Sequence, residues 1–402
     1  MEIKVLIFAF LAYGVYADWE TPIRVDENCT TEMKRATLYT DQITRVTHYF
    51  WCQLDKNTGR FYLYYRRQIP QGILYPETIL DISHSCEGVS IAGSSDGGRL
   101  YVAYNARRSR PRTSCNEDIT DGCMDIYTLQ SLDGGLSWSI PAVIPRKNLK
   151  DVRNRWAPKA IINPFTDRVW VFYLTQETED MMYSIGYSSK PDNSILYNSE
   201  VLMNTRKELI LDVTAALSNP GSLNIHLVWS GEANKVLTMN QMVSSNNGIN
   251  WRGVGSVDKG FAGNMVSNII MNARNMFIPF LQQMGSPTYI KTSTDGGSRW
   301  SSTQISQYSG LPDICLCFKS FGNDGAVFSL LNAKLGEGNY VGEFGYIDIN
   351  NGKWIKGSKP FGNFILNYDP NIRCYVENGN YVVKAIAISE NTNLYVTKNI
   401  LS

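Results

Sequence analysis

Short hydrophobic segments separated by turn-forming residues recur along the whole chain. Seven of them are rich in aromatic and β-branched residues, and each follows a turn signal built mainly from Asn, Asp, Gly or Pro. Another short apolar segment precedes each turn, so the pattern predicts seven β-hairpins roughly 45 to 60 residues apart. No long stretch has the 3.6-residue period of an amphipathic helix. The chain is therefore predicted to be all β. The seven segments read RFYLYYRR, RLYVAYNA, RVWVFYL, NIHLVWS, MFIPFLQ, AVFSLLNA and YVVKAIAIS.

This repeat length indicates a single β-propeller, in which four-stranded blades stand around a central channel. In the second repeat, strands are expected at Val89–Gly93, Leu100–Asn105 and Asp125–Gln130, and Trp138 is expected to open the fourth strand. The repeats favour seven blades, with six as the alternative, because the third and fourth strands are poorly defined in the repeat near residues 43–82.

A nine-residue motif closes several of the repeats. Ser131–Ser139 reads SLDGGLSWS, Ser293–Ser301 reads STDGGSRWS, and Ser244–Trp251 keeps the spacing with Asn in place of the acid. Glycine permits the positive φ of a tight turn, and the acid can accept backbone N–H groups within it. The motif is therefore predicted to be a structural turn whose Trp packs between blades. Its positions are Ser131, Asp133, Gly135 and Trp138; Ser244, Asn246, Gly248 and Trp251; and Ser293, Asp295, Gly297 and Trp300.

The two ends of the chain predict how the ring closes. The last repeat supplies three strands, and the sequence then stops. Near the N-terminus, WETPIRV (Trp19–Val25) matches WSIPAVI (Trp138–Ile144) at the Trp, the Pro and the final branched residue. The N-terminal strand is therefore expected to complete the last blade, which would remove two exposed sheet edges.

The first residues, MEIKVLIFAFLAYGVYA, have the pattern of a secretory signal peptide cleaved after Ala17. The apolar run from Val5 to Val15 is too short to span a bilayer comfortably. We therefore predict a signal peptide at residues 1–17, a propeller domain at residues 18–402, secretion, and no transmembrane anchor. The formal net charge of +1 gives no general attraction to nucleic acid or an anionic membrane surface.

Eight cysteines in a secreted chain favour disulfides over metal ligands. Cys115 and Cys123 form the clearest pair, because a bond between them would close the loop CNEDITDGC; the other pairs cannot be deduced. Cys315 and Cys317 could suggest a metal or redox site, but no histidine cluster accompanies them, so neither a metal nor a cofactor is expected. Asn28 lies in the only N-x-[ST] sequon and is the predicted glycosylation site.

The repeated motif resembles the Asp-box, S-x-D-x-G-x-x-W, of the sialidase (neuraminidase) family, and the resemblance extends over nearly the whole mature chain. It implies a propeller whose Asp-boxes lie on the outer part of the blades, away from the active site. Sialidases have six blades. The family's catalysis needs three arginines that clamp a carboxylate, an aspartic acid as general acid, and a tyrosine nucleophile activated by a glutamate.

The best match to this machinery lies in the second repeat. There the resemblance places the family's arginine at Arg107 or Arg108, and its general acid at Asp118 or Asp121. The alternative is that these acids belong to a surface loop closed by a disulfide. Tyr340 with Glu232 is a conceivable nucleophile pair, although no spacing singles it out.

The rest of the arginine clamp fits less well. The family's first clamp arginine should stand just before the inner strand of this repeat, yet the segment from Ser83 to Gly93 contains none. Arg67, in RRQIP, lies one repeat too early, and Arg373 is a possible third member. Lysine does not substitute for arginine here, because the guanidinium group binds a carboxylate with two parallel hydrogen bonds. The catalytic set is therefore predicted to be incomplete.

The loops expected on one rim carry charges of both signs beside aromatic residues, with Arg155 and Trp156 at a strand boundary. Arginine beside aromatic rings suits acidic glycans or anionic protein loops. The sequence therefore favours a secreted, non-catalytic propeller that binds a glycan, for example a sialylated one, or an extracellular protein. The alternative is an exo-sialidase with a divergent clamp, and a glycosidase for another sugar is a further alternative. The segment Arg107–Arg112 could also be a site of proteolytic processing.

Overall fold

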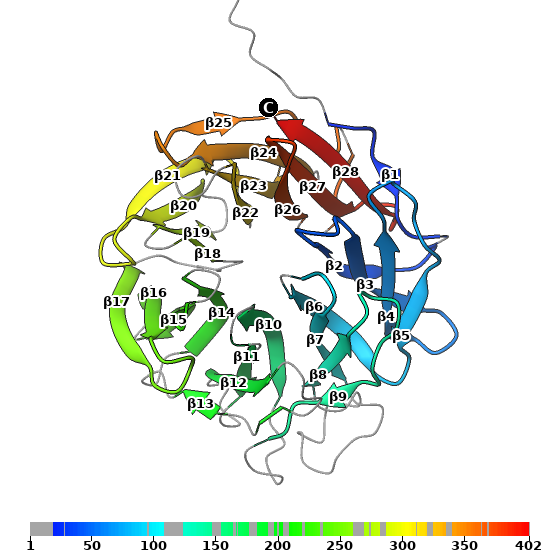
Figure 1. Ribbon diagram of the computed structural model, residues 1–402, viewed down its shortest axis with the longest axis horizontal. Helices are drawn as coiled ribbons and strands as arrows, with labels where there is room; N and C mark the ends of the chain where they lie inside the picture. The colour runs from blue at the N-terminus through cyan, green and yellow to red at the C-terminus, as the bar shows by residue number, and fades with distance from the viewer. Residues whose placement is uncertain are drawn as a thin grey trace, which may run out of the picture.

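The computed structural model is a ring of seven antiparallel β-sheets, each with four strands (Figure 1). Its described part contains strands and turns and no helix, so it also contains no helix that could span a membrane. The structure describes residues 19–27, 29–94, 96–107, 124–146, 154–163, 166, 168–176, 183–191, 197–198, 201–203, 209–218, 222–233, 236–259, 269–272, 275–281, 287–310, 312–319, 325–334, 340–362, 364–367 and 370–401.

Each sheet is one blade, numbered here from 1 to 7 along the chain. Six blades consist of four consecutive strands, whereas the seventh takes one strand from the N-terminus. Blade 1 holds β2 (Met33–Thr40), β3 (Thr47–Asp55), β4 (Arg60–Gln68) and β5 (Thr78–Asp81); blade 2 holds β6 (Ser85–Gly93), β7 (Leu100–Arg107), β8 (Met124–Ser131) and β9 (Ala142–Val143); blade 3 holds β10 (Arg155–Asn163), β11 (Arg168–Gln176), β12 (Tyr183–Pro191) and β13 (Val201–Met203); blade 4 holds β14 (Leu209–Leu217), β15 (Ile225–Ala233), β16 (Val236–Ser244) and β17 (Arg252–Lys259); blade 5 holds β18 (Ile270–Asn272), β19 (Asn275–Leu281), β20 (Thr288–Ser293) and β21 (Ser301–Ser306); blade 6 holds β22 (Pro312–Phe318), β23 (Gly325–Lys334), β24 (Tyr340–Asp348) and β25 (Trp354–Lys356); blade 7 holds β26 (Asn371–Glu377), β27 (Asn380–Ile388), β28 (Leu394–Leu401) and β1 (Ile23–Arg24).

The strand directions give the ring two different faces. The first strand of every blade contacts the first strands of the neighbouring blades around the centre, and all four strands of a blade alternate in direction (Figure 1). One face therefore carries the connections between blades and the loops between second and third strands; we call it the connection face. The other carries the turns between first and second and between third and fourth strands; we call it the Asp-box face.

The prediction of an all-β propeller is confirmed, and the structure has the favoured number of seven blades rather than the alternative of six. The repeat near residues 43–82, whose outer strands were poorly defined in the sequence, forms blade 1 with all four strands. One detail of blade 2 differs from expectation: its outer strand β9 begins at Ala142 rather than at Trp138. Trp138 is instead packed against aromatic rings of blade 1.

The N-terminal strand closes the ring, as predicted. β1 pairs with β28 through Ile23↔Val396 and Arg24↔Tyr395 and so becomes the outer strand of blade 7. Further backbone hydrogen bonds run from Glu20 N to Lys398 O (2.8 Å) and from Val25 N to Leu394 O (2.7 Å). The same short segment therefore completes one sheet and joins the two ends of the chain.

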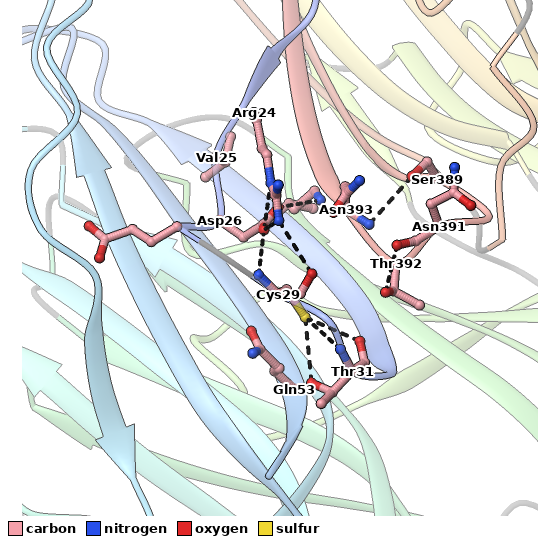
Figure 2. Close-up of polar contacts among 12 residues, drawn as sticks. Arg24, Val25, Asp26, Cys29, Thr31, Gln53, Ser389, Asn391, Thr392 and Asn393 are labelled. Atoms are coloured by element: carbon pink, nitrogen blue, oxygen red, sulfur yellow. Dashed lines mark hydrogen bonds and ion pairs between the residues drawn. The ribbon is translucent and has the colours of Figure 1, made fainter. Parts of the chain in front are cut away.

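Asp26 is the central polar residue of this closure (Figure 2). Its buried carboxylate accepts hydrogen bonds from the backbone N–H of Leu394 (2.7 Å) and of Cys29 (3.0 Å), and it forms an ion pair with Arg24 (2.5 Å). Leu394 begins the last strand, whereas the other partners belong to the N-terminal segment. Asp26 therefore holds the two ends of the chain together.

Three Asp-box turns connect the third and fourth strands of blades 2, 4 and 5. In each turn the Ser hydroxyl donates to the acid or to its Asn replacement and accepts the N–H of the Gly four residues later. That Gly has a positive φ in all three: 83° at Gly135, 81° at Gly248 and 92° at Gly297. The amide oxygen of Asn246 accepts the N–H of Asn250 (2.8 Å), so it acts as the carboxylate does in the other copies.

Two of these turns are fastened to the preceding blade in the same way. The Tyr65 hydroxyl of blade 1 donates to Gly135 O (3.2 Å), and the Tyr187 hydroxyl of blade 3 donates to Gly248 O (2.9 Å). The Trp of each turn, Trp138 or Trp251, meets the same Tyr and a neighbouring Phe edge-on, at centroid distances between 5.0 and 5.9 Å. The turns therefore act as staples between blades.

The third staple uses different residues. Gly297 of blade 5 faces the Gln241 amide of blade 4, which is hydrogen-bonded to His226 Nδ1 (2.9 Å). The arrangement matches that of Tyr65, which is hydrogen-bonded to His48 Nδ1 (2.9 Å). Both histidines are buried and lie beneath an Asp-box turn.

Two disulfides link neighbouring blades in the described part of the chain. Cys52–Cys86 joins β3 of blade 1 to β6 of blade 2, and Cys315–Cys374 joins β22 of blade 6 to β26 of blade 7. Cys29 and Cys317 are buried thiols. The predicted pair Cys115–Cys123 lies outside the described residues, as does Asn28.

The buried histidines predict a loss of stability in mild acid. Burial lowers the pKa of His48 to about 3 and that of His226 to about 4. The unfolded chain therefore binds protons near pH 6.5 that the folded chain does not, so stability falls as the pH drops below 6.5. Each histidine should cost about 2 kcal/mol between pH 7 and pH 5.

Urea unfolding at pH 7, 6 and 5 measures this effect while most carboxylates stay ionised. In the His226→Gln variant the pH dependence should shrink by about half, since one of the two titrating groups is gone. An unchanged pH dependence in this variant would contradict the assignment.

Removing the Asp26 carboxylate should weaken ring closure. Asp26→Ala leaves the N–H groups of Leu394 and Cys29 without their buried acceptor, and we expect a loss of about 2–4 kcal/mol in unfolding free energy. Asp55→Ala is the matched control, because Asp55 caps an exposed turn through Thr58. Equal effects of the two variants in urea unfolding would contradict the role of Asp26.

Candidate functional site

The candidate site is the centre of the connection face, where the first strands of the blades meet; we call this region the channel mouth. In four consecutive blades the first strand contains a β-bulge close to its first residue, which lies at this face. These strands are β2, β6, β10 and β14. Bulges bend a strand and redirect a side chain, and they are frequent beside binding sites. This half of the channel mouth is therefore lined by locally irregular backbone.

Arg35 lies in the bulge of β2 and extends into solvent at this mouth. Its φ of +37° is unusual for a residue other than glycine, and its side chain is exposed. The Cδ atom lies 3.8 Å from the position that a Cβ would take at Gly88 in the β6 bulge. Among the described residues, no hydrogen-bond or ion-pair partner meets its guanidinium group. Arg35 is thus a positive charge available to a ligand.

Arg107, a candidate from the sequence, lies at the end of β7 and forms an ion pair with Glu87 of the β6 bulge. Its Nε lies 2.7 Å from Glu87 Oε1, and both side chains are partly exposed. The two groups belong to the same blade and stand close to the channel mouth. The pair presents both signs of charge to solvent at this point of the connection face.

Arg155 is held inside the protein. Its side chain is fully buried, and Nη1 lies 3.3 Å from Asp125 Oδ1 and donates to Ile144 O (2.8 Å). Arg146 Nη2 lies 3.3 Å from the other Asp125 oxygen. Two guanidinium groups therefore converge on one carboxylate, but that carboxylate belongs to the chain itself. The cluster joins blade 2 to blade 3.

Arg373 is engaged in the same way on the opposite side of the ring. Its Nη1 lies 2.9 Å from Asp313 Oδ2, and that oxygen also accepts from Asn371 Nδ2 (2.5 Å) and from the Ile372 backbone N–H (3.0 Å). The Asn371 amide oxygen accepts in turn from the Leu38 backbone N–H (3.3 Å). These contacts link the first strands of blades 6, 7 and 1.

The structure separates several other candidates. Arg67 lies near the end of β4 and so belongs to the Asp-box face, where its guanidinium group covers the ring of Tyr75 (4.0 Å). Glu232 is the second-to-last residue of β15 in blade 4 and Tyr340 begins β24 in blade 6, with blade 5 between them (Figure 1). Trp156 is half-buried in the β10 bulge and packs against the core between blades 3 and 4.

Three further candidates, Arg108, Asp118 and Asp121, lie outside the described residues.

A second polar group lies on the connection face at the junction of blades 1 and 2. Asp81 ends β5, and its Oδ2 accepts from His84 Nδ1 (2.9 Å) and from the Tyr104 hydroxyl (2.6 Å). The His84 ring packs on Tyr127, with 4.0 Å between ring centroids. Asp81 and Tyr104 are buried, whereas the His84 side chain is 21% exposed. Burial and the neighbouring Asp81 raise the pKa of the Tyr104 hydroxyl, which therefore stays protonated.

Comparison with known proteins identifies the fold. No protein-family model matches the sequence, and no curated protein matches it by sequence. Among solved structures, Trypanosoma rangeli sialidase in complex with sialic acid aligns with a TM-score of 0.54 at 11% identity, covering 83% of this chain and 56% of that one. Hadza microbial sialidase Hz136 aligns with a TM-score of 0.55 at 10% identity, covering 88% and 77%.

The chain therefore has a sialidase-like β-propeller fold, and it spans little more than half the length of the trypanosomal enzyme (56%). The resemblance recognised from the Asp-boxes is thus supported by the structure. The difference lies in blade number, since the family implies six blades and this chain has seven. At these identities the likeness concerns the fold alone.

Sequence reasoning missed Arg35 and His84. Arg35 lies in MKRATLY, where nothing marks the bulge that turns it outward. A signal for His84 existed, since Asp81 precedes it by three residues, but its Tyr104 partner becomes visible only once the blades are packed.

Replacing Arg155 should destabilise the fold rather than affect a ligand. Nη1 of Arg155 makes both contacts, and the ammonium of a lysine ends one bond short of that position, so Arg155→Lys should lose about 2–4 kcal/mol of unfolding free energy. The control is Arg35→Lys, which alters an exposed arginine and should change stability by less than about 0.5 kcal/mol. Comparable losses in the two variants would contradict the assignment.

Proposed function

We propose that this protein is a non-catalytic binding module that recognises an acidic glycan at the channel mouth of its connection face. One observation carries the proposal: on this face, Arg107, Arg155 and Arg373 each form an ion pair with an acid of the chain itself. A clamp for a substrate carboxylate needs guanidinium groups that the protein has not already neutralised. The geometry thus favours binding over a preformed catalytic clamp.

Arg35 supports the choice of an acidic ligand. It is exposed and unpaired within the described chain, and its backbone is held at a strained positive φ. Strain of this kind persists where the surrounding structure imposes it, and it is concentrated at ligand-binding sites. A carboxylate or sulfate on a sugar is the natural partner for such a group. The trypanosomal sialidase, which has a similar fold, forms a complex with sialic acid, and this favours a sialylated glycan.

We place the protein outside the cell. The N-terminal segment reads as a signal peptide, and two disulfides in the described chain fit an oxidising compartment. A glycan at Asn28 would lie next to the ring closure at Asp26 and Cys29 in sequence. An extracellular protein partner that carries the glycan is compatible with this function.

The alternative is an exo-sialidase with a divergent clamp. It is favoured by the sialidase-like fold and by Asp118 and Asp121, to which the sequence resemblance assigns the family's general acid. In that case Arg35 would serve as one clamp residue. Binding and hydrolysis are separable by experiment.

We expect no hydrolysis of a fluorogenic sialoside by the mature protein between pH 4 and pH 8, together with binding to sialylated or sulfated glycans on an array. Asp118→Asn and Asp121→Asn should leave both results unchanged. Fluorophore release that is lost in one of these variants would name a general acid and establish the alternative function.

Arg35→Ala should weaken glycan binding about tenfold or more, because a charge-assisted hydrogen bond is lost. Arg299→Ala is the matched control: it removes the same charge from an exposed position on the Asp-box face. Binding is measured by titration with the best glycan on the array, and the thermal midpoint checks the fold. Equal affinity in the two variants would contradict the role of Arg35.

A further inference from the structure

We propose that His84, oriented by Asp81 and Tyr104, forms a hydroxyl-binding subsite for a sugar at the junction of blades 1 and 2. The proposal rests on the glycan-binding function proposed above. It adds a second recognition group on the connection face, one that accepts a hydrogen bond where Arg35 donates.

The contacts of Asp81 fix which ring nitrogen of His84 carries the proton. Burial acts to raise the pKa of Asp81, but hydrogen bonds from His84, Tyr104 and the Ser83 backbone N–H outweigh it and lower the pKa below the ordinary value. Asp81 is therefore an ionised carboxylate, which can only accept. Nδ1 of His84 must donate to it, and in the neutral ring Nε2 keeps the lone pair.

Nε2 of His84 has no hydrogen-bond partner within the described chain. The hydrogen bond at Nδ1 and the packing on Tyr127 together fix the plane and the orientation of the ring. Nε2 then has no partner among the described residues, while the side chain remains 21% exposed. His48 and His226 differ, since both are buried and bonded beneath Asp-box turns.

The tie between the blades does not require an imidazole. Asp81 already joins blade 1 to blade 2 through the Tyr104 hydroxyl at 2.6 Å, and the Cys52–Cys86 disulfide spans the same two blades. A structural role would be fulfilled without His84. His84 adds a hydrogen-bond acceptor, Nε2, at the surface. The buried Asp81 carboxylate orients the ring so that Nε2 can meet a hydroxyl donor.

The surroundings indicate the class of ligand. Ser85, the residue after His84, is the strand partner of Arg107, so the subsite adjoins the Glu87–Arg107 ion pair. The imidazole nitrogen of His84 and the carboxylate of Glu87 can accept hydrogen bonds from sugar hydroxyl groups, and the guanidinium group of Arg107 can donate to them. A polyhydroxylated sugar can serve all three groups, because each of its hydroxyl groups both donates and accepts. Asp81 and Tyr104 are positioning residues in this arrangement, because they act through His84.

Two substitutions separate recognition from a structural role. In His84→Asn the amide nitrogen can take the place of Nδ1 and donate to Asp81, but nothing replaces Nε2. In His84→Gln the amide oxygen can take the place of Nε2 and accept from a hydroxyl. Affinity is titrated with the array glycan that the wild-type protein binds best, and the thermal midpoint is recorded for each variant.

We expect His84→Asn to bind about three- to tenfold more weakly at an unchanged thermal midpoint, and His84→Gln to bind more tightly than His84→Asn. The subsite is overturned if His84→Asn binds as the wild type does, if weaker binding comes only with a lowered midpoint, or if His84→Gln binds no better than His84→Asn. If the wild-type protein binds no glycan on the array, the proposed function itself fails, which is distinguishable from these outcomes.

Discussion

The structure depends on contacts between neighbouring blades, because a propeller has no core outside them. Each four-stranded sheet buries its two faces only against its neighbours, so a ring that opens exposes two of these faces to water at once. The chain reinforces the contacts at several levels: apolar clusters between sheets, two disulfides between blades, Asp-box staples at one face and charged ties at the other. Asp26 adds the contact that holds the chain ends together.

This constraint explains why the two faces serve different purposes. On the Asp-box face, the turns of blades 2, 4 and 5 bond their polar groups within the turn and pack their Trp against the preceding blade, so their chemistry is used for the fold. The connection face carries bulged strands, exposed arginine and an oriented histidine. Among the described residues of this face, Arg155 and Arg373 neutralise acids of the chain itself, whereas Arg35 and His84 reach the surface, and we propose these two as the groups that meet a ligand.

The sequence predicted the fold well because the fold is set by local patterns that repeat. Turn-forming residues mark the hairpins, and the Asp-box marks the ends of third strands. The similarity of Trp19–Val25 to Trp138–Ile144 predicted the strand that closes the ring. The site was much less predictable. In the sequence Arg155 was predicted to bind a ligand. Its guanidinium group is instead buried because it pairs with Asp125, which lies thirty residues earlier and in another blade. Likewise, nothing local shows that Arg35 sits in a bulge or that Tyr104 meets Asp81.

The central claim is that the connection face binds an acidic glycan without cleaving it. The most direct measurement is an NMR experiment on α-linked sialyllactose mixed with the mature protein, which reads contact and cleavage in one sample. We predict saturation transfer from the protein to the sugar, reduced in Arg35→Ala, with no free sialic acid formed over days. Free sialic acid that accumulates in proportion to the protein concentration would contradict the account and make this propeller an enzyme.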